Sequence, residues 1–471
     1  MFKKIKFSLI SICCVLGGCA LMGPDYEKPD THVPEEWSNT VVSANYDTKN
    51  MPELAWWEEY NDPTLNQLID KALKVNNNVQ IAVSNLEVAQ GELEQTELGW
   101  VPSFNLLAGL SQLPNLGYPG TFLAFIPEYI LNIFTQIKKV EFAEYGVERA
   151  EYAKDAVRLS TIGMVANSYF TYLAQRELYA EFVELDSTLM QLSSLITQEF
   201  EIGTKNLIDI QVIDAEVDAI QAQLKVFKHN IVISSNSLKY LINENPGSIL
   251  TDKSFTELPV STVNYANMPA TVLADRPDIG YAETQLKMAN TAIGIATSSF
   301  LPGINLKAFI SRLSNTEPAP QSGLQTPDEN VFLKQAMLTY DFDPTMIGKI
   351  STASSEYRSS YYGYFNQVRL ALKEVDTALS ANQLYTQSYE NLYSSYQHIE
   401  TQYDLTNQLY EIGLDSLIQA LYVKVKLQEL KIELTQNKLQ QLLTVVALYQ
   451  NLGGGYLHNT KDNNESKDKK E

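Results

Sequence analysis

The chain repeats itself between residues 78–111, NVQIAVSNLEVAQGELEQTELGWVPSFNLLAGLS, and residues 278–311, DIGYAETQLKMANTAIGIATSSFLPGINLKAFIS, which align without gaps. Random pairing of typical compositions would leave roughly two identities in such a stretch. The alignment has eight: Ala82/Ala282, Leu86/Leu286, Ala89/Ala289, Pro102/Pro302, Asn105/Asn305, Leu106/Leu306, Ala108/Ala308 and Ser111/Ser311. A second echo follows, in which FEIG at 200–203 returns as YEIG at 410–413. A repeat unit of about 200 residues is too long for a solenoid, so the sequence predicts two copies of one helix–strand–helix module.

Long helices are expected on both sides of the repeated stretch. Residues 137–200 and 346–410 contain no proline and only two interior glycines each. Each would be roughly 90 Å long, at about 1.5 Å per residue, a length that favours coiled-coil packing. After Gly203, apolar residues recur at alternating spacings of three and four, as in Ile210, Ile213, Val217, Ile220, Leu224 and Phe227. The matching segment of the second copy has two apolar stripes, which suits a helix packed between two neighbours; an ordinary four-helix bundle core is the alternative.

Strand patterns interrupt the helices at equivalent places. Apolar residues alternate with polar or small ones after Pro102 and again after Pro302, over about ten residues each. This is the length and pattern of a tilted membrane strand with one lipid face and one polar face. A returning strand is expected near 122–134 and near 331–342, beyond loops at 114–120 and 315–327. Four strands cannot close a barrel, so a barrel would have to be shared between chains.

The N-terminus resembles the signal of an exported lipoprotein. Three lysines precede a short apolar run, and Leu16-Gly17-Gly18-Cys19 looks like a bacterial lipobox, whose cysteine becomes lipidated. Ala20 rather than aspartate after the cysteine suggests sorting to the outer membrane of a Gram-negative cell. An ordinary cleaved signal is the alternative. Residues 20–60 lack periodicity and are expected to run as an extended strap, which Trp56 and Trp57 would pin unless they serve plain helix packing.

Composition narrows the classes of function. The formal net charge is −21, which disfavours nucleic acid as a partner because phosphate binding needs a basic face. No stretch after Cys19 has eighteen uninterrupted apolar residues. With the other two cysteines in the signal and the four histidines scattered, neither a metal site nor a cofactor is expected, and no catalytic constellation is found.

These residues together resemble the TolC-like outer-membrane efflux factors, in particular the NodT/OprM-like lipoprotein branch that serves resistance–nodulation–division pumps. GPDYEKP at 23–29 resembles the N-terminal motif of that branch, and RPDI at 276–279, with AIGIA at 292–296 and FLP at 300–302, resembles its mid-chain motif. YEIGL at 410–414 and LGGGY at 452–456 resemble the last hairpin turn and the terminator. The order and spacing of these motifs carry the resemblance, because none alone is diagnostic.

The resemblance implies a mainly helical homotrimer with a transmembrane β part. Twelve strands, four from each chain, would form a barrel in the outer membrane, and helical segments would continue it as a periplasmic tunnel. It also implies a periplasmic adaptor protein, an inner-membrane transporter and outer-membrane lipid as partners. The chain would be a passive conduit with a gated periplasmic end and no enzyme activity.

The resemblance also assigns roles to residues at the two hairpin turns. The adaptor would contact Ile202, Gly203, Thr204, Ile412, Gly413 and Leu414. The two glycines could alternatively serve only as helix C-caps. The closed aperture would involve Tyr410, Asp415, Gln419 and Tyr422, with Asp209 and Asp214 as further acidic candidates that could equally lie on a solvated helix face. The family commonly has an aspartate nine residues beyond the second glycine, where this chain has Tyr422, so an acidic ring there is in doubt.

The expected organisation has six parts: a signal peptide at 1–18, a lipid-anchored extended segment at 19–60, a first repeat at 61–250, a linker at 251–275, a second repeat at 276–457 and a disordered charged tail at 458–471. Two other readings stay open. A structural coiled-coil lipoprotein would explain Cys19 and the heptads but not the duplicated strands. The outer-membrane component of a type I protein secretion system would share the architecture. The exported substrate cannot be inferred from the sequence.

Overall fold

The computed structural model describes residues 22–34, 51–111, 120–259, 270–315, 329–340 and 343–458. Cys19 and the signal segment before it lie outside these residues, as does nearly all of the charged tail. The fold is mainly helical. It divides into two compact units, of which the first comprises Met1–Asp30, Ser84–Tyr152 and Gly280–Asn366, and the second Thr31–Val83, Ala153–Ile279 and Gln367–Glu471.

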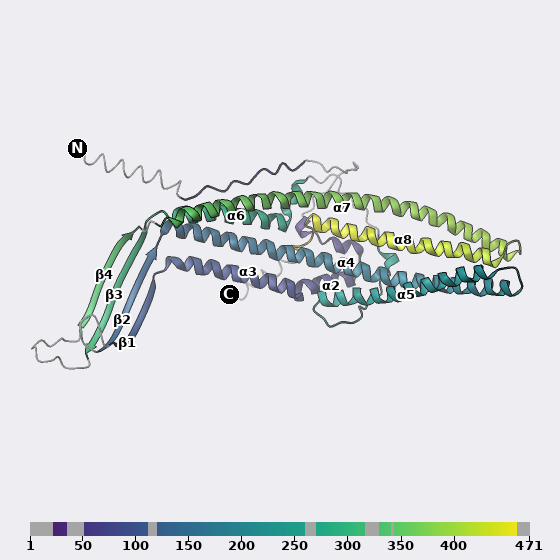
Figure 1. Ribbon diagram of the computed structural model, residues 1–471, viewed down its shortest axis with the longest axis horizontal. Helices are drawn as coiled ribbons and strands as arrows, with labels where there is room; N and C mark the ends of the chain where they lie inside the picture. The colour runs from purple at the N-terminus through teal and green to yellow at the C-terminus, as the bar shows by residue number, and fades with distance from the viewer. Residues whose placement is uncertain are drawn as a thin grey trace, which may run out of the picture. The chain divides into compact units, whose positions relative to one another are not determined.

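The first unit contains a four-stranded antiparallel sheet in the order β1-β2-β3-β4. Its strands are β1 (Ser103–Ser111), β2 (Gly120–Leu131), β3 (Gly303–Asn315) and β4 (Glu329–Thr339), and Figure 1 shows them side by side. They fall on the four segments expected from the sequence, apart from the ends of the second and fourth strands. The fourth runs from Glu329 to Thr339 where 331–342 was expected. The second strand ends at Leu131 and not at 134, because the side-chain oxygen of Asn132 accepts a hydrogen bond from the Thr135 amide (3.1 Å) and begins the next helix.

The register gives the sheet two unlike faces. One cross-strand row runs Leu106–Phe125–Ile310–Phe332, so it is apolar on all four strands. All four of these side chains are exposed in the protomer. A row on the opposite face runs Ser103–Glu128–Lys307–Gln335, with an ion pair of 3.1 Å between Lys307 Nζ and Glu128 Oε1. The central row of one face is therefore apolar on all four strands, although Lys334 and Arg312 share that face, and the opposite face carries the Glu128–Lys307 ion pair.

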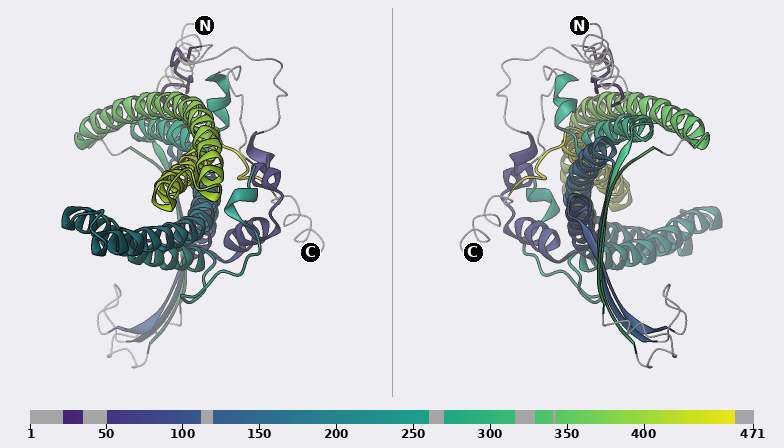
Figure 2. Two further views of the ribbon diagram at one scale, coloured as in Figure 1. Left: turned by 90° about the vertical axis from the view of Figure 1, so that its right-hand side faces the viewer. Right: turned by 90° about the vertical axis from the view of Figure 1, so that its left-hand side faces the viewer.

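Two long helical hairpins dominate the second unit (Figure 1 and Figure 2). Helix α4 (Ile133–Glu201) returns as α5 (Leu207–Leu241), and α7 (Thr345–Glu411) returns as α8 (Leu417–Asn451). The expected helices at 137–200 and 346–410 fall within α4 and α7. In chain order, the remaining helices are α2 (Pro63–Val75), α3 (Asn77–Glu97) and α6 (Pro277–Ser298). Both α4 and α7 contribute residues to each unit.

Apolar stripes hold the two hairpins together. A core cluster takes Leu185, Leu189 and Leu192 from α4, Ile213 from α5, and Leu421 from α8, and the predicted heptad positions of α5 pack on it. Much of helix α8 is buried. This helix also bonds to α7, where Gln441 Nε2 donates to Thr386 Oγ1 (2.7 Å). The two apolar stripes of α8 therefore reflect its place between α4 and α7.

Residues 51–60 depart from the expected extended strap. They form two short 3-10 helices, Met51–Glu53 and Trp56–Tyr60, within the second unit. Trp56 stacks on Tyr449 of α8, with ring centroids 4.8 Å apart and planes 8° apart, and Trp57 meets the His458 ring edge-on. Both indoles are buried. The two tryptophans thus attach the short helix Trp56–Tyr60 to the end of α8 and to the residues that follow it.

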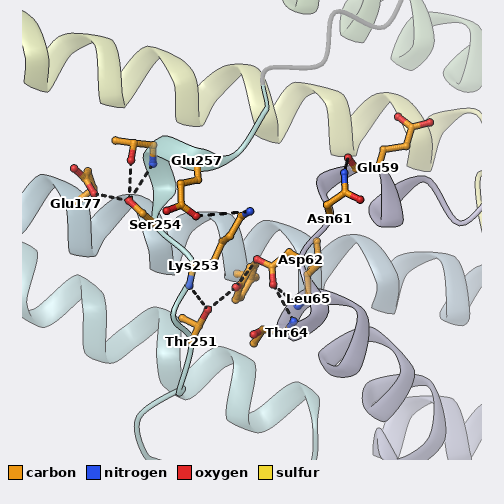
Figure 3. Close-up of polar contacts among 12 residues, drawn as sticks. Glu59, Asn61, Asp62, Thr64, Leu65, Glu177, Thr251, Lys253, Ser254 and Glu257 are labelled. Carbon is orange, nitrogen blue, oxygen red and sulfur yellow. Dashed lines mark hydrogen bonds and ion pairs between the residues drawn. The ribbon is translucent and has the colours of Figure 1, made fainter.

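A buried polar cluster fixes the start of α2 in the same unit (Figure 3). Asp62 is the N-cap, and its carboxylate accepts the amides of Thr64 (2.9 Å) and Leu65 (3.2 Å). The same carboxylate accepts the hydroxyl of Tyr169 from α4 (2.7 Å), and that hydroxyl also bonds to Thr251 (2.9 Å). One buried carboxylate therefore links α2, α4 and the segment after α5.

The RPDI motif has a structural role in the second unit. Arg276 forms ion pairs with Asp278 (2.7 Å) and with Glu374 of α7 (2.8 Å). Its guanidinium also donates to the backbone oxygen of Asn451 at the end of α8 (2.8 Å). These bonds tie the start of α6 to the middle of α7 and the end of α8, and they raise the pKa of Arg276 despite its burial.

Candidate functional site

The first hairpin turn is built by a glycine in the left-handed conformation. Gly203 has a φ of +82°, and its amide donates to Phe200 O (3.0 Å) while the Thr204 amide donates to Glu199 O (2.9 Å). This is a Schellman C-cap. Asn206 then begins α5 in a capping box, in which Asp209 Oδ2 accepts the Asn206 amide (2.9 Å). The turn is therefore fixed by local bonds at both helix ends.

The second turn repeats this construction. Gly413 has a φ of +79°, its amide donates to Tyr410 O (2.9 Å), and the Leu414 amide donates to Leu409 O (2.8 Å). Ser416 Oγ accepts the Gln419 amide (3.2 Å) at the start of α8. A Cβ atom at either turn glycine would meet open space, so the requirement for glycine comes from φ alone.

Both turns present apolar side chains to the outside. Ile202 and Ile208 are 76% and 73% exposed at the first turn, and Ile412 and Leu414 are 68% and 73% exposed at the second. Figure 1 shows both turns at the same end of the paired hairpins in the second unit. Isolated exposed apolar residues are ordinary, but such side chains concentrated at two equivalent turns form a surface suited to a protein partner.

The acidic side chains proposed for the aperture make hydrogen bonds within the protomer. Asp209 belongs to the capping box, and Asp415 Oδ1 accepts the Ser416 amide (2.7 Å). Asp214 on α5 accepts a hydrogen bond from Ser193 Oγ on α4 (2.8 Å) and so links the two helices of the first hairpin. Each of the three carboxylates stabilises a helix end or a hairpin in the protomer.

Gln419 and Tyr422 lie together on an exposed face of α8. The exposed residues of this helix recur at spacings of three and four, which places them on one side. We call this the open face of α8; its members are Gln419, Tyr422, Lys426, Glu429, Glu433, Gln436 and Gln440. Tyr410, at the end of α7, is also exposed. The structure thus leaves both candidate tyrosines accessible; Asp214 is exposed as well, while Asp209 and Asp415 are half-buried.

A buried carboxyl group between α4 and α8 escaped the sequence reasoning. Glu181 is 4% exposed, and its Oε1 accepts a hydrogen bond from Thr435 Oγ1 of α8 (2.9 Å). Lys431 Nζ is 3.8 Å away, and Glu181 Oε2 has no hydrogen-bond partner among the described residues. Burial raises the pKa of Glu181 to about 7, although the Thr435 bond and the Lys431 charge oppose the rise.

Lys438 is a second buried ionisable group on α8. Its ammonium donates to Thr256 O (2.9 Å) and lies 5.4 Å from the centre of the Phe255 ring. Burial lowers the pKa of Lys438 to about 8. The only signal for either group was a charged residue interrupting an apolar stripe, as Glu181 does between Leu178 and Leu185.

Two other kinds of feature are absent from the parts of the chain that the structure describes. None of the helices there has the length and apolar character needed to cross a membrane. The same residues contain no group of three or more histidine, cysteine or acidic side chains placed to hold a metal ion.

The family model for "Outer membrane efflux protein" matches residues 68–244 and 268–454. Among curated relatives, the "Probable efflux pump outer membrane protein TtgC" of Pseudomonas putida is 26% identical, with 98% of each chain covered. The "Probable outer membrane lipoprotein SilC" of Salmonella typhimurium is 23% identical, covering 96% of this chain and 99% of SilC. The open-state structure of the MtrE outer membrane channel of Neisseria gonorrhoeae superposes with a TM-score of 0.78 at 22% identity, covering 92% of this chain and 98% of MtrE.

Proposed function

This chain belongs to the outer membrane efflux protein family, and we propose that three copies of it form one conduit across the outer membrane. The chain is an outer-membrane channel component of an efflux pump, like its relatives. The finer assignment concerns how the conduit is built, which partners it meets and where it closes.

The proposal of a barrel shared between copies rests on the two edges of the sheet. Within the described residues, strands β1 and β4 each pair on one side only, so both edges of the four-stranded sheet offer backbone groups that are unpaired there. Such edges are not tolerated in lipid, where every backbone polar group must be satisfied within the protein. Pairing β4 of one copy with β1 of the next would satisfy both edges, and three copies would give twelve strands.

The two faces of the sheet support the same arrangement. The row Leu106–Phe125–Ile310–Phe332 would face lipid, and the row that contains Glu128 and Lys307 would face the aqueous interior. Lipid attached to Cys19, after removal of residues 1–18, would anchor each copy to the same membrane. The two repeats, 61–250 and 276–457, would then form equivalent parts of the wall of the conduit.

The hairpin turns are the proposed contact with the rest of the pump. Exposed Ile202 and Thr204 at the first turn, and Ile412 and Leu414 at the second, would meet a periplasmic adaptor that links the channel to an inner-membrane transporter. Rigid caps at Gly203 and Gly413 would keep these side chains in place. Tyr410 and Tyr422 would narrow the closed aperture, while Asp209, Asp214 and Asp415 would act mainly through their bonds within the hairpins. The chain is proposed to act as a passive conduit and not as an enzyme.

Conductance across a planar lipid bilayer tests the function. The purified full-length protein is expected to give discrete single-channel currents. Addition of a purified adaptor hairpin is expected to change these currents. Failure of correctly folded, lipid-inserted protein to pass current under any voltage or adaptor condition would contradict the proposal.

A further inference from the structure

A cavity of about 500 Å³ lies among the long helices of the second unit, and the α8 residues that line it begin at Glu433, eleven residues beyond Tyr422. All four long helices line it, with Leu178 from α4, Phe227 from α5, Tyr385 from α7 and Leu439 from α8 among the contributors. Its volume falls within the range of sites that hold drug-sized molecules. The size and the four-helix lining distinguish this cavity from a groove along a single helix.

The polar groups of the cavity favour a cation. Glu433 is the one charged side chain among the ten residues that line it. Asn437 adds a buried oxygen, because its Nδ2 donates to Ser388 Oγ (2.9 Å) while its Oδ1 has no hydrogen-bond partner within the described residues. A carboxylate and an unsatisfied carbonyl oxygen together call for a positively charged ligand that carries N–H donors.

The remaining wall favours an aromatic or apolar body on that cation. The Phe227 ring packs on Phe182, with centroids 4.6 Å apart, and also lines the cavity, and Tyr385 provides a second ring from α7. Leu178 and Leu439, both buried, complete the apolar surface. Aromatic faces and leucine side chains next to a carboxylate suit an amphipathic cation better than a hydrated metal ion.

The cavity opens on the open face of α8. Glu433, Gln436 and Gln440 belong to that face together with Gln419 and Tyr422. A ligand in the cavity would therefore lie on the same side of the helix as the proposed aperture, about 16 Å along the axis from Tyr422 to Glu433. Molecules that pass the aperture would meet the cavity directly.

We propose that this cavity is a binding site for amphipathic organic cations with N–H donors, held by Glu433 and Asn437 as they move along the wall of the conduit. This inference rests on the proposed function for the identity of its ligands as cargo. Binding itself can be measured without transport.

Proflavine, a fluorescent planar diaminoacridinium cation, is a suitable probe. Fluorescence anisotropy would follow its binding to the full-length protein in lipid nanodiscs, with empty nanodiscs as the reference. Glu433→Gln is expected to weaken proflavine binding about tenfold or more, the loss of one hydrogen-bonded charge contact. Acridone, an uncharged ring system of similar size, should bind more weakly to the wild-type protein and equally to both proteins.

Glu429→Gln is the matched control, because Glu429 lies on the same open face but does not line the cavity. Its ion pair with Lys426 (3.2 Å) is exposed, so its loss should leave proflavine affinity within about twofold of wild type. Equal weakening by the two variants would overturn the proposal in favour of a general surface-charge effect. Absence of saturable binding to wild-type protein would also overturn it, as expected if a second copy fills the cavity. Either result would leave a channel with normal conductance unaffected, so the two failures are distinguishable.

Discussion

At the scale of the residue, Glu181 is an unusual component of a coiled-coil wall. Its carboxyl group lies between α4 and α8 with one oxygen bonded to Thr435 and the other unbonded. The charged groups that face it are Glu177 and Glu184 on its own helix and Lys431 on α8. The charge of Glu181 also contributes to the raised pKa of Tyr396 on α7. Burial dominates these influences, so the neutral form is favoured when the helices are packed.

This carboxyl group predicts a specific pH dependence of stability. The pKa of Glu181 is about 7 when folded, above the ordinary value of 4.5, so its favourable contribution is complete below pH 4.5 and is lost as pH rises through 7. The loss is roughly 3 kcal/mol across that window. Thermal unfolding from pH 4.5 to 8 should show a decline in wild type that Glu181→Gln largely removes. Lys438 stays protonated over most of that window and contributes little to the decline.

Glu151→Gln provides the control for that experiment, because Glu151 is exposed on the same helix and is not among the charged groups that face Glu181. It should retain the pH profile of the wild-type protein. An unchanged profile in Glu181→Gln would show that the buried carboxyl group does not control the packing of α4 against α8.

Tyr422 carries the second prediction at this scale. It is 44% exposed on α8, nine residues beyond Gly413. If Tyr422 narrows the closed aperture by its bulk, Tyr422→Ala should increase single-channel conductance several-fold, since the fold leaves its side chain out of the core. Tyr393→Ala, at an exposed position of α7 far from the turn, should leave conductance unchanged. Conductance of Tyr422→Ala equal to that of the control would remove Tyr422 from the aperture.

At the scale of the element, periodicity and the internal repeat predicted the long helices and strands well. The apolar spacing in α5 and the two stripes in α8 reflect how many neighbours each helix has, which is why the pattern was informative. Element ends were less predictable, because a single side-chain bond decides them, as Asn132 does between β2 and α4. The repeat also located the two turn glycines.

Other features of the site could not be predicted from patterns in the sequence. Asp209 and Asp415 looked like free acidic groups, but each bonds to a backbone amide at a helix start, and only three-dimensional geometry shows this. Glu181 interrupts an apolar stripe in the sequence, and only the structure shows that its carboxyl group is buried. The 3-10 helices around Trp56 and Trp57 have too few residues for any periodicity to appear. Local sequence therefore predicted elements and turns, while the partners of polar groups came from packing.

The two open edges of the sheet yield a cross-linking prediction. Joining β1 of one copy to β4 of the next places side chains of the same sheet face opposite each other. A cysteine at Leu106 should therefore form a disulfide with a cysteine at one of the β4 positions that share its face: Phe332, Lys334, Ala336 or Leu338. The product should be a covalent trimer on denaturing gels.

Cysteines at Gln335 and Met337 are the matched controls, because the register places both on the opposite face of β4. Native thiols should not interfere, since Cys13 and Cys14 precede the expected cleavage site and Cys19 is the expected lipid acceptor. Cross-linking that is equally efficient at positions on both faces, or absent at all four same-face positions, would be incompatible with the proposed pairing of β1 and β4.

At the scale of the whole molecule, the protomer is only part of a functional structure. Its sheet ends in two unpaired edges, and its apolar row is exposed on one face. Its hairpin turns present apolar side chains at rigid caps, and the open face of α8 connects those turns to a cavity. The sheet edges and the turns gain protein partners if copies of the chain surround a common axis and an adaptor meets the turns, while the open face of α8 would line the conduit.

The mass of the particle extracted from the outer membrane tests this central claim most directly. Native mass spectrometry of the purified protein, released from detergent, should give a single species of about three times the mass of the lipidated mature chain. A stably folded particle that contains one copy and does not associate in lipid would contradict the shared conduit.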